Sequence, residues 1–165
     1  MANLGDSSFQ TQVRWTGGYV AGQSGARSYT RDMLVEPEGK PPIVGSAGAR
    51  FFGDDSRYNP EDLMLASLAE CHLLTYLALA TQAGIRLDAL SVRVTGALAK
   101  IDGKTRFERA TLHAETRVAP GTDPERAREL HARAHEQCFM SNSVNFPIDV
   151  EATIGTTDAS PTEAR

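Results

Sequence analysis

The chain has 165 residues, of which 41% are hydrophobic and 23% charged, an ordinary composition for one globular domain with a core. Its formal net charge is −4 and it has no long run of Lys or Arg, so neither a nucleic acid nor an anionic membrane surface is an expected partner. No signal peptide is visible at the start of the chain, and we expect a cytoplasmic protein.

Two segments near the start of the chain have the alternating pattern of half-buried strands. They are residues 9–15 and 28–36, and the connection between them is rich in glycine. This pattern predicts a hairpin with a long loop. Pro and Gly punctuate residues 37–49, which predicts an irregular segment there.

The strongest signal is a helix that begins after Asn59. Asn59 is a suitable N-cap, Pro60 suits the first helical position, and Gly84 suits the left-handed position that ends a helix. Residues 63–80 are apolar nearly all round, so the helix must be buried on most faces. We interpret it as the central helix of the core rather than as a membrane span, because it carries Glu70 and His72.

The second half of the chain predicts two strands, a helix and a last strand. Asp102-Gly103 is a hairpin-turn signal between the two strands, and Asp123-Pro124 opens the helix. The elements are expected at residues 90–99, 108–119, 122–138 and 146–154.

The order of these elements describes an α+β domain. We expect a single domain over residues 9–155, with disordered tails at residues 1–8 and 156–165.

Cys71 interrupts the apolar helix, and a packing role and a chemical role are both open. It lies twelve residues after Asn59, roughly 18 Å along the axis, where the helix dipole is too weak to activate a thiol. Burial raises a thiol pKa, so a nucleophilic Cys71 needs an Arg or Lys from elsewhere in the fold. His72 cannot supply that charge, because consecutive helical residues do not face each other, and Glu70 is expected to face away from the thiol.

Cys138 is the only other cysteine, and it follows His131 and His135 at helical spacing. Three such side chains on one helical face resemble part of a zinc site, although no fourth ligand is apparent. Spacing does not decide whether Cys71 and Cys138 pair, because a disulfide needs Cα atoms within about 7 Å.

Two stretches carry a resemblance to a known family. "NPEDLMLASLAEC" (59–71) and "CFMSNSVNFPIDV" (138–150) resemble the two cysteine motifs of the OsmC/Ohr family of thiol-dependent peroxidases. The resemblance implies an intertwined α+β homodimer, in which antiparallel sheets pack around a long central helix. It also implies a role in defence against oxidative and osmotic stress.

The chemistry that the resemblance implies is a two-thiol peroxidase reaction. Cys71 would attack an organic hydroperoxide and become a sulfenic acid, and Cys138 would then form a disulfide with it. A lipoyl-type dithiol would reduce that disulfide, and no metal or bound cofactor would be required. Phe139-Met140 departs from the Pro and aliphatic residue of many relatives, which bears on how freely Cys138 approaches Cys71.

The family pattern adds a Glu and an Arg to the site. Glu61 lies ten residues before Cys71, roughly 15 Å along one helix, so it would have to come from the partner subunit. Its simpler role is that of a negative charge at a helix N-terminus. The activating arginine is expected to be Arg27. The alternatives are Arg31, Arg50 and Arg57.

Two other functions are open on the same residues. The first is a non-catalytic protein that binds an apolar small molecule in the dimeric pocket, with both cysteines as core residues. The second is a cysteine-dependent acyl hydrolase, which would need a histidine paired with Cys71.

Overall fold

The computed structural model describes residues 7–157. The predicted tails at residues 1–8 and 156–165 fall almost entirely outside this range, although Thr156 is the last residue of a strand. The chain divides into two compact units, one up to Leu63 and one from Met64, and each is considered by itself.

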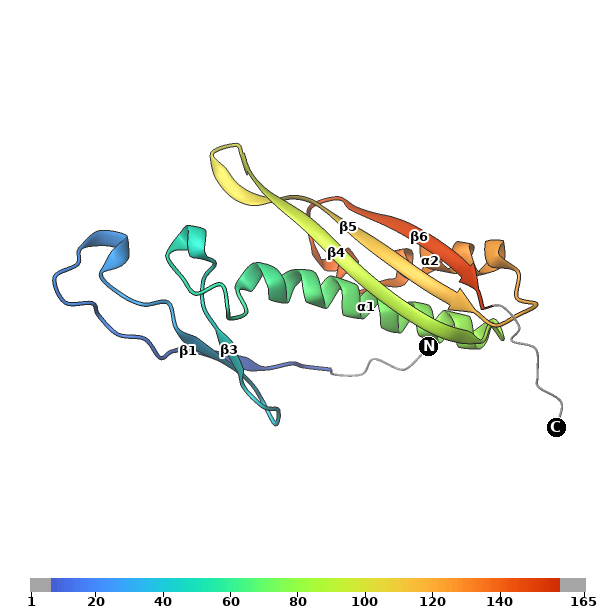
Figure 1. Cartoon of the computed structure of the whole chain (residues 1–165), viewed down its shortest axis with the longest axis horizontal. Coiled ribbons are helices and arrows are strands. Elements are labelled where there is room, and N and C mark those ends of the chain that lie inside the picture. Colours follow the sequence, from blue (N-terminus) through green and yellow to red (C-terminus); the bar gives the residue numbers. More distant parts are fainter. Residues whose placement is uncertain (1–6, 158–165) are drawn as a thin grey trace. The chain divides into compact units, whose positions relative to one another are not determined.

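The first unit contains a three-stranded antiparallel sheet (Figure 1). Its strands are β1 (Thr11–Trp15), β2 (Met33–Pro37) and β3 (Ile43–Gly45), in the order β1-β2-β3. The pairing of β1 with β2 confirms the predicted hairpin with its long loop. The prediction of an irregular segment after β2 was wrong in part, because Ile43 and Val44 pair with β2 before the chain turns away.

This first sheet has almost no core. Within residues 7–63 the only buried residues are Gly45 and Ser46. Several large apolar side chains are exposed, among them Trp15 at 49% and Tyr19 at 83%. A small sheet needs a hydrophobic face buried against another element for its stability, and the first unit taken by itself buries almost none.

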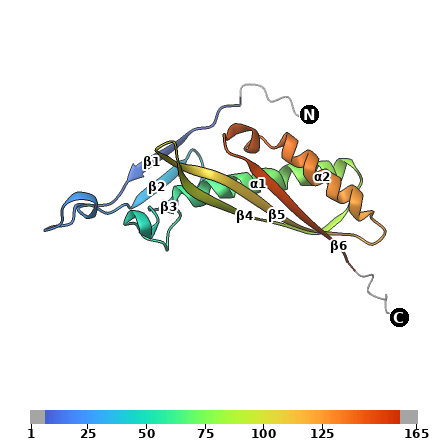
Figure 2. The ribbon, with the colours of Figure 1, turned by 90° about the horizontal axis from the view of Figure 1, so that it is seen from above.

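The second unit consists of two helices on one face of a three-stranded sheet (Figures 1 and 2). Its main elements are α1 (Pro60–Gln82), β4 (Leu87–Ile101), β5 (Lys104–Val118), α2 (Pro124–Gln137) and β6 (Ile148–Thr156). The first turn of α1 belongs to the first unit.

Local side-chain chemistry sets the ends of these elements as predicted. The Asn59 carboxamide accepts a hydrogen bond from the Asp62 N–H at 2.8 Å, and the Asp62 carboxylate accepts one from the Asn59 N–H at 3.2 Å. This reciprocal cap begins α1, and Gly84 has the left-handed φ of 69° just after α1 ends. Asp102 and Gly103 both have positive φ in the β4–β5 turn, as expected of a type I′ hairpin.

The sheet β4-β5-β6 differs from the expectation of antiparallel sheets. β4 and β5 are antiparallel, but β6 pairs with β5 in parallel. The reason is the crossover through α2, which carries the chain back along the sheet so that β6 starts at the same end as β5.

The core of the second unit lies between the sheet and its two helices. Alternate residues of β5 from Ala110 to Val118 are buried, and the residues between them are polar or partly exposed. Leu68 of α1 packs against Leu112 of β5, while Tyr76 of α1 packs with Leu130 of α2. By length and composition α1 could cross a membrane, but in this unit it is the helix that packs on the sheet.

Candidate functional site

The second unit brings the two cysteines together. Cys71 lies in the middle of α1, and Cys138 is the C-cap residue of α2. Both are free thiols, and the Cys138 thiol lies close enough to Cys71 to raise the pKa of the Cys71 thiol. Cys138 is fully buried, whereas Cys71 is partly accessible. The structure therefore places side by side two thiols whose pairing the sequence spacing left open.

A tight turn after α2 fixes the position of Cys138. The N–H of Ser141 points at the Cys138 sulfur at 3.5 Å, and the N–H of Asn142 donates to the Cys138 carbonyl at 3.0 Å. The Cys138 N–H in turn donates to the carbonyl of His135 at 3.2 Å. Backbone hydrogen bonds thus hold this cysteine on both sides.

The surroundings of Cys71 have opposing effects on its acidity. Burial raises the pKa of the Cys71 thiol, and the neighbouring Cys138 thiol raises it further. The backbone N–H groups of Met140 and Phe139 lower the pKa, because they favour the thiolate. Burial is the largest effect. In residues 64–157 no Arg or Lys side chain is hydrogen-bonded to either sulfur, so these residues leave Cys71 less acidic than an ordinary thiol.

Cys71 opens into a pocket of about 300 Å³. Leu74 and Phe139 form apolar walls and are themselves 56% and 62% exposed. Glu70, which is expected to face away from the thiol, is exposed to solvent, and it also lines the rim of this open pocket. The remaining lining residues are Ser67, Thr75 and Met140. A pocket of this size and composition fits an alkyl or aryl group with one polar end.

The segment Phe139-Met140 has a role that sequence reasoning missed. Its side chains line the pocket, and its N–H groups point at the Cys71 sulfur. No sequence pattern indicated this role, because main-chain donors are independent of residue type and depend on the turn that follows α2.

Glu61 lies in the first turn of α1, which is one continuous helix through Cys71. The ten-residue separation therefore corresponds to roughly 15 Å along the axis, too far for contact within one chain. A continuous helix is the condition under which Glu61 is expected to act on Cys71 of the partner subunit, and α1 is continuous.

The four candidate arginines of the first unit differ in their partners. Arg57 is held by two carboxylates, Asp32 at 2.7 Å and Asp54 at 3.2 Å. Arg31 donates to backbone carbonyls, including that of Tyr29 at 2.8 Å, and its guanidinium lies 4.3 Å from the centre of the Tyr29 ring. Both side chains already have several partners.

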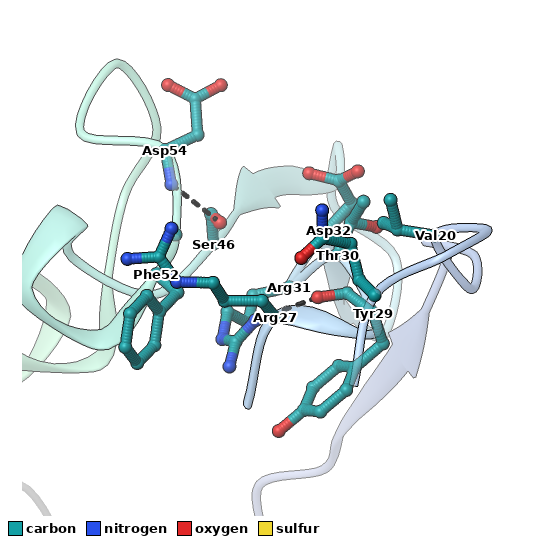
Figure 3. Close-up of a pocket in the computed structure, with 11 residues that line it drawn as sticks. Val20, Arg27, Tyr29, Thr30, Arg31, Asp32, Ser46, Phe52 and Asp54 are labelled. Carbon is teal, nitrogen blue, oxygen red and sulfur yellow. Dashed lines mark hydrogen bonds between the residues drawn. The ribbon is translucent and has the colours of Figure 1, made fainter. Parts of the chain in front are cut away.

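Arg27 and Arg50 have fewer partners. Within residues 7–157 neither has a carboxylate or hydrogen-bond acceptor, and each lies over an aromatic ring, Phe52 at 5.2 Å for Arg27 and Phe51 at 6.0 Å for Arg50. Only Arg27 of these two lines the pocket of about 450 Å³ in the first unit (Figure 3). Its guanidinium is therefore available to an anionic group.

A buried row of polar side chains lies behind Cys71. His72 Nε2 is 3.1 Å from His131 Nδ1, and His131 Nε2 is 2.9 Å from the Thr116 hydroxyl. Both imidazoles are essentially inaccessible. Burial, and then the nearby His135, lower the pKa of His72 to about 4. Burial, followed by His72 and Arg128, lowers the pKa of His131 to about 3.

These histidines bear on two of the alternatives. His72 is turned to His131, and none of the described histidines is hydrogen-bonded to Cys71, which leaves the acyl hydrolase without its base. In residues 7–157 no three His, Cys, Asp or Glu side chains converge as metal ligands. His131, which the zinc alternative needs, instead has both ring nitrogens in hydrogen bonds.

The buried imidazoles predict a loss of stability in acid. Unfolding returns His72 and His131 to their ordinary pKa near 6.5. Below that pH the unfolded chain therefore binds more protons than the folded chain, and the free energy of unfolding decreases as the pH is lowered. His72 alone should cost about 3 kcal/mol between pH 7 and pH 4. Urea unfolding at several pH values measures this dependence. His113→Gln, which removes a half-buried histidine outside this pair, should keep the part of the slope that His72 and His131 cause, and a flat profile above pH 4 in the parent protein would contradict the prediction.

Comparisons with known proteins agree with this fold. No curated protein matches the chain. An OsmC-like protein of unknown function from Vibrio cholerae has a TM-score of 0.80 at 24% identity, covering 89% of this chain and 99% of that one. An organic hydroperoxide resistance protein OsmC from Legionella pneumophila has a TM-score of 0.67 at 22% identity, covering 90% and 97%. OhrB of Bacillus subtilis, an organic hydroperoxide resistance protein, has a TM-score of 0.62 at 22% identity, covering 90% and 98%.

The solved structures confirm the predicted α+β class and the OsmC/Ohr type of fold. The family model described as OsmC-like protein matches residues 53–153, which include both cysteines and the whole of α1 and α2. This match extends over more than half of the chain, and the chain therefore belongs to the OsmC family.

Proposed function

We propose that this protein reduces organic hydroperoxides to alcohols with Cys71 as the peroxidatic thiol and Cys138 as the resolving thiol. The observation that carries the proposal is the contact between two free thiols, one of them at the edge of an apolar pocket. Membership of the OsmC family supports it, as do the solved structures named as organic hydroperoxide resistance proteins.

The proposed reaction has three balanced steps. The Cys71 thiolate attacks the distal peroxide oxygen, the O–O bond breaks, and the alkoxide takes a proton and leaves as the alcohol. The Cys138 sulfur then attacks the Cys71 sulfenic acid, forming a disulfide and releasing water. A dithiol of the lipoyl type reduces the disulfide and is itself oxidised to a cyclic disulfide. A reducing compartment such as the cytoplasm supplies such dithiols.

The proposed active form is a homodimer in which each site combines residues of two chains. The exposed apolar surface of the first sheet supports this form, because a second copy is a cover of matching chemistry. Arg27 lowers the pKa of Cys71 in this arrangement, and Glu61 of one subunit holds the arginine against Cys71 of the other. The lack of an acidic partner for Arg27 within residues 7–157 supports its assignment.

A second candidate function is the binding of an apolar small molecule without turnover. The observation that favours it is the raised pKa of Cys71, since a neutral thiol is a weak nucleophile. The two functions differ in whether the thiol becomes acidic in the assembled protein.

The two cysteines should have separable roles. Cys71→Ser should abolish turnover of cumene hydroperoxide with dihydrolipoamide. Cys138→Ser should still consume one equivalent of peroxide and then stall as a sulfenic acid, because no resolving thiol is present. Stopped-flow kinetics and intact mass spectrometry measure both outcomes. If Cys71 in the parent protein reacted no faster than free cysteine, the binding function would replace the enzymatic one.

The arginine assignment has a matched control in the same unit. Arg27→Gln should slow oxidation of Cys71 by about 100-fold and raise the pKa of its thiol, since a close cation is worth a few kcal/mol to a desolvated thiolate. Arg50→Gln removes a guanidinium that likewise lies over an aromatic ring and should leave both quantities unchanged. A larger effect of Arg50→Gln would assign the role to Arg50.

Mixed dimers test whether Glu61 acts across the interface. Glu61→Gln and Cys71→Ser should each be inactive or severely impaired alone. Mixed and refolded together, they should recover about a quarter of the parent activity, since half of the dimers are mixed and each holds one intact site. Turnover with cumene hydroperoxide measures the recovery. No recovery in dimers shown by mass spectrometry to be mixed would mean that Glu61 acts within its own chain or not at all.

A further inference from the structure

The polar row behind Cys71 joins the two helices that carry the thiols. His72 is the residue after Cys71 on α1, and its ring lies parallel to that of His131 on α2, 5.4 Å between centroids and 8° between planes. Their nitrogens are 3.1 Å apart, within hydrogen-bonding distance. We call this pair the imidazole bridge.

The imidazole bridge is fixed from the side of the sheet and from α1. His131 is hydrogen-bonded to the Thr116 hydroxyl of β5 at 2.9 Å. The Tyr76 ring stacks on the His131 ring at 3.8 Å, and the Tyr76 hydroxyl donates to the Ala127 carbonyl at 3.1 Å. These side chains are at most 2% exposed. The imidazole of His131 therefore has only one position available to it.

A polar bridge here is unexpected on grounds of stability alone. Two leucines of similar size would fill the same space without dehydrating any ring nitrogen. His72 Nδ1 in fact has no hydrogen-bond partner in its buried position, and the same is true of the His135 Nδ1 atom nearby. What a hydrogen-bonded pair adds over apolar packing is direction, since it sets a definite distance and register between two helices.

The bridge lies beside one thiol on α1 and two helical turns from the other on α2. His131 is seven residues before Cys138, two helical turns along the same face of α2, and His72 directly follows Cys71. Fixing His131 against His72 therefore sets how far α2 extends along α1. That position decides where the C-cap of α2 places the Cys138 sulfur.

We propose that the imidazole bridge holds Cys138 in position to form a disulfide with Cys71, so that His72 and His131 are positioning residues. The inference rests on the proposed function for its use in turnover. A disulfide requires Cβ atoms about 4 Å apart and a narrow range of torsion angles, so a small slide of α2 along α1 removes productive encounters. The bridge thereby raises the effective concentration of one thiol at the other.

Besides Tyr76, which stacks on His131, two charged or titratable groups lie around the bridge, and they define the pH range of the test. His135 lies near His72, and Arg128 lies near His131, each disfavouring a protonated bridge. Both bridge histidines are therefore neutral at pH 7, and the experiments belong there.

The first test separates oxidation of Cys71 from resolution by Cys138. One equivalent of cumene hydroperoxide is mixed with the reduced protein at pH 7, and samples are quenched with dimedone and weighed by mass spectrometry. His131→Phe retains a ring to stack on Tyr76 but loses both hydrogen bonds. It should slow disulfide formation at least about 10-fold and leave the rate of Cys71 oxidation within about 3-fold of the parent.

Further variants distinguish a positioning role of the bridge from a general loss of stability. Leu79→Ala shortens a buried apolar side chain of the core between α1 and α2 without removing a polar atom of the bridge or of its partners, and its resolution rate should match the parent. His72→Gln keeps a side-chain N–H near the position of Nε2 and should recover most of the rate that His72→Leu loses. If His131→Phe does not fold, Thr116→Val, which removes one hydrogen bond of His131, should give the same slowing to a smaller extent.

A second measurement does not depend on peroxide. The equilibrium between the dithiol and the Cys71–Cys138 disulfide is measured in a dithiothreitol redox buffer, which gives the effective concentration of the two thiols. His131→Phe should lower it at least about 10-fold even if the parent protein proves inert to hydroperoxides, in which case only the proposed function fails. A parent-like equilibrium and resolution rate in His131→Phe would overturn the positioning role, as would an equal slowing in Leu79→Ala.

Discussion

The dehydration of Cys71 is the constraint on which the rest of the site depends. A thiol placed in the middle of an apolar helix has a raised pKa, yet only the thiolate is a useful nucleophile. The helix dipole does not help, because the thiol lies about three turns from the start of α1. Every other feature around Cys71 either maintains this dehydration or compensates for it.

The apolar surroundings have a function of their own. Leu74 and Phe139 line the pocket at the thiol, and in the proposed reaction they would contact the carbon chain of the hydroperoxide. The N–H groups of Phe139 and Met140 offset part of the cost to the thiolate without adding a charged side chain to the pocket. The same two residues thus supply the wall and the donors, which explains why both lie next to Cys138.

Much of the fold followed from local chemistry that a sequence displays directly. Asn59 begins α1, Gly84 follows its end, and Asp102-Gly103 turns the β4–β5 hairpin, because each of these preferences is set by one or two residues. The pairing of β3 with β2 and the parallel direction of β6 were not predicted, since both depend on partners distant in the sequence.

Less of the candidate site than of the fold could be predicted from the sequence. Both cysteines were found through the resemblance of their motifs, but only the folded chain shows that the two thiols touch. The pocket itself was not predicted, because one of its walls comes from the turn after α2 and is not visible in the helix pattern. The imidazole bridge was not predicted either, because it joins two helices that are distant in the sequence. His72 and His131 are 59 residues apart, and no periodicity links them.

The requirement for a cation connects the chemistry to assembly. The candidate arginines lie in the first unit, whose sheet exposes Trp15 and other large apolar side chains and buries almost nothing. Such a sheet gains stability when another surface covers it. If that surface is a second copy of the chain, the burial that stabilises the sheet also delivers Arg27 to a thiol. Cys71 would then remain a weak acid in the isolated chain and become reactive on dimerisation, which confines peroxide chemistry to the assembled protein.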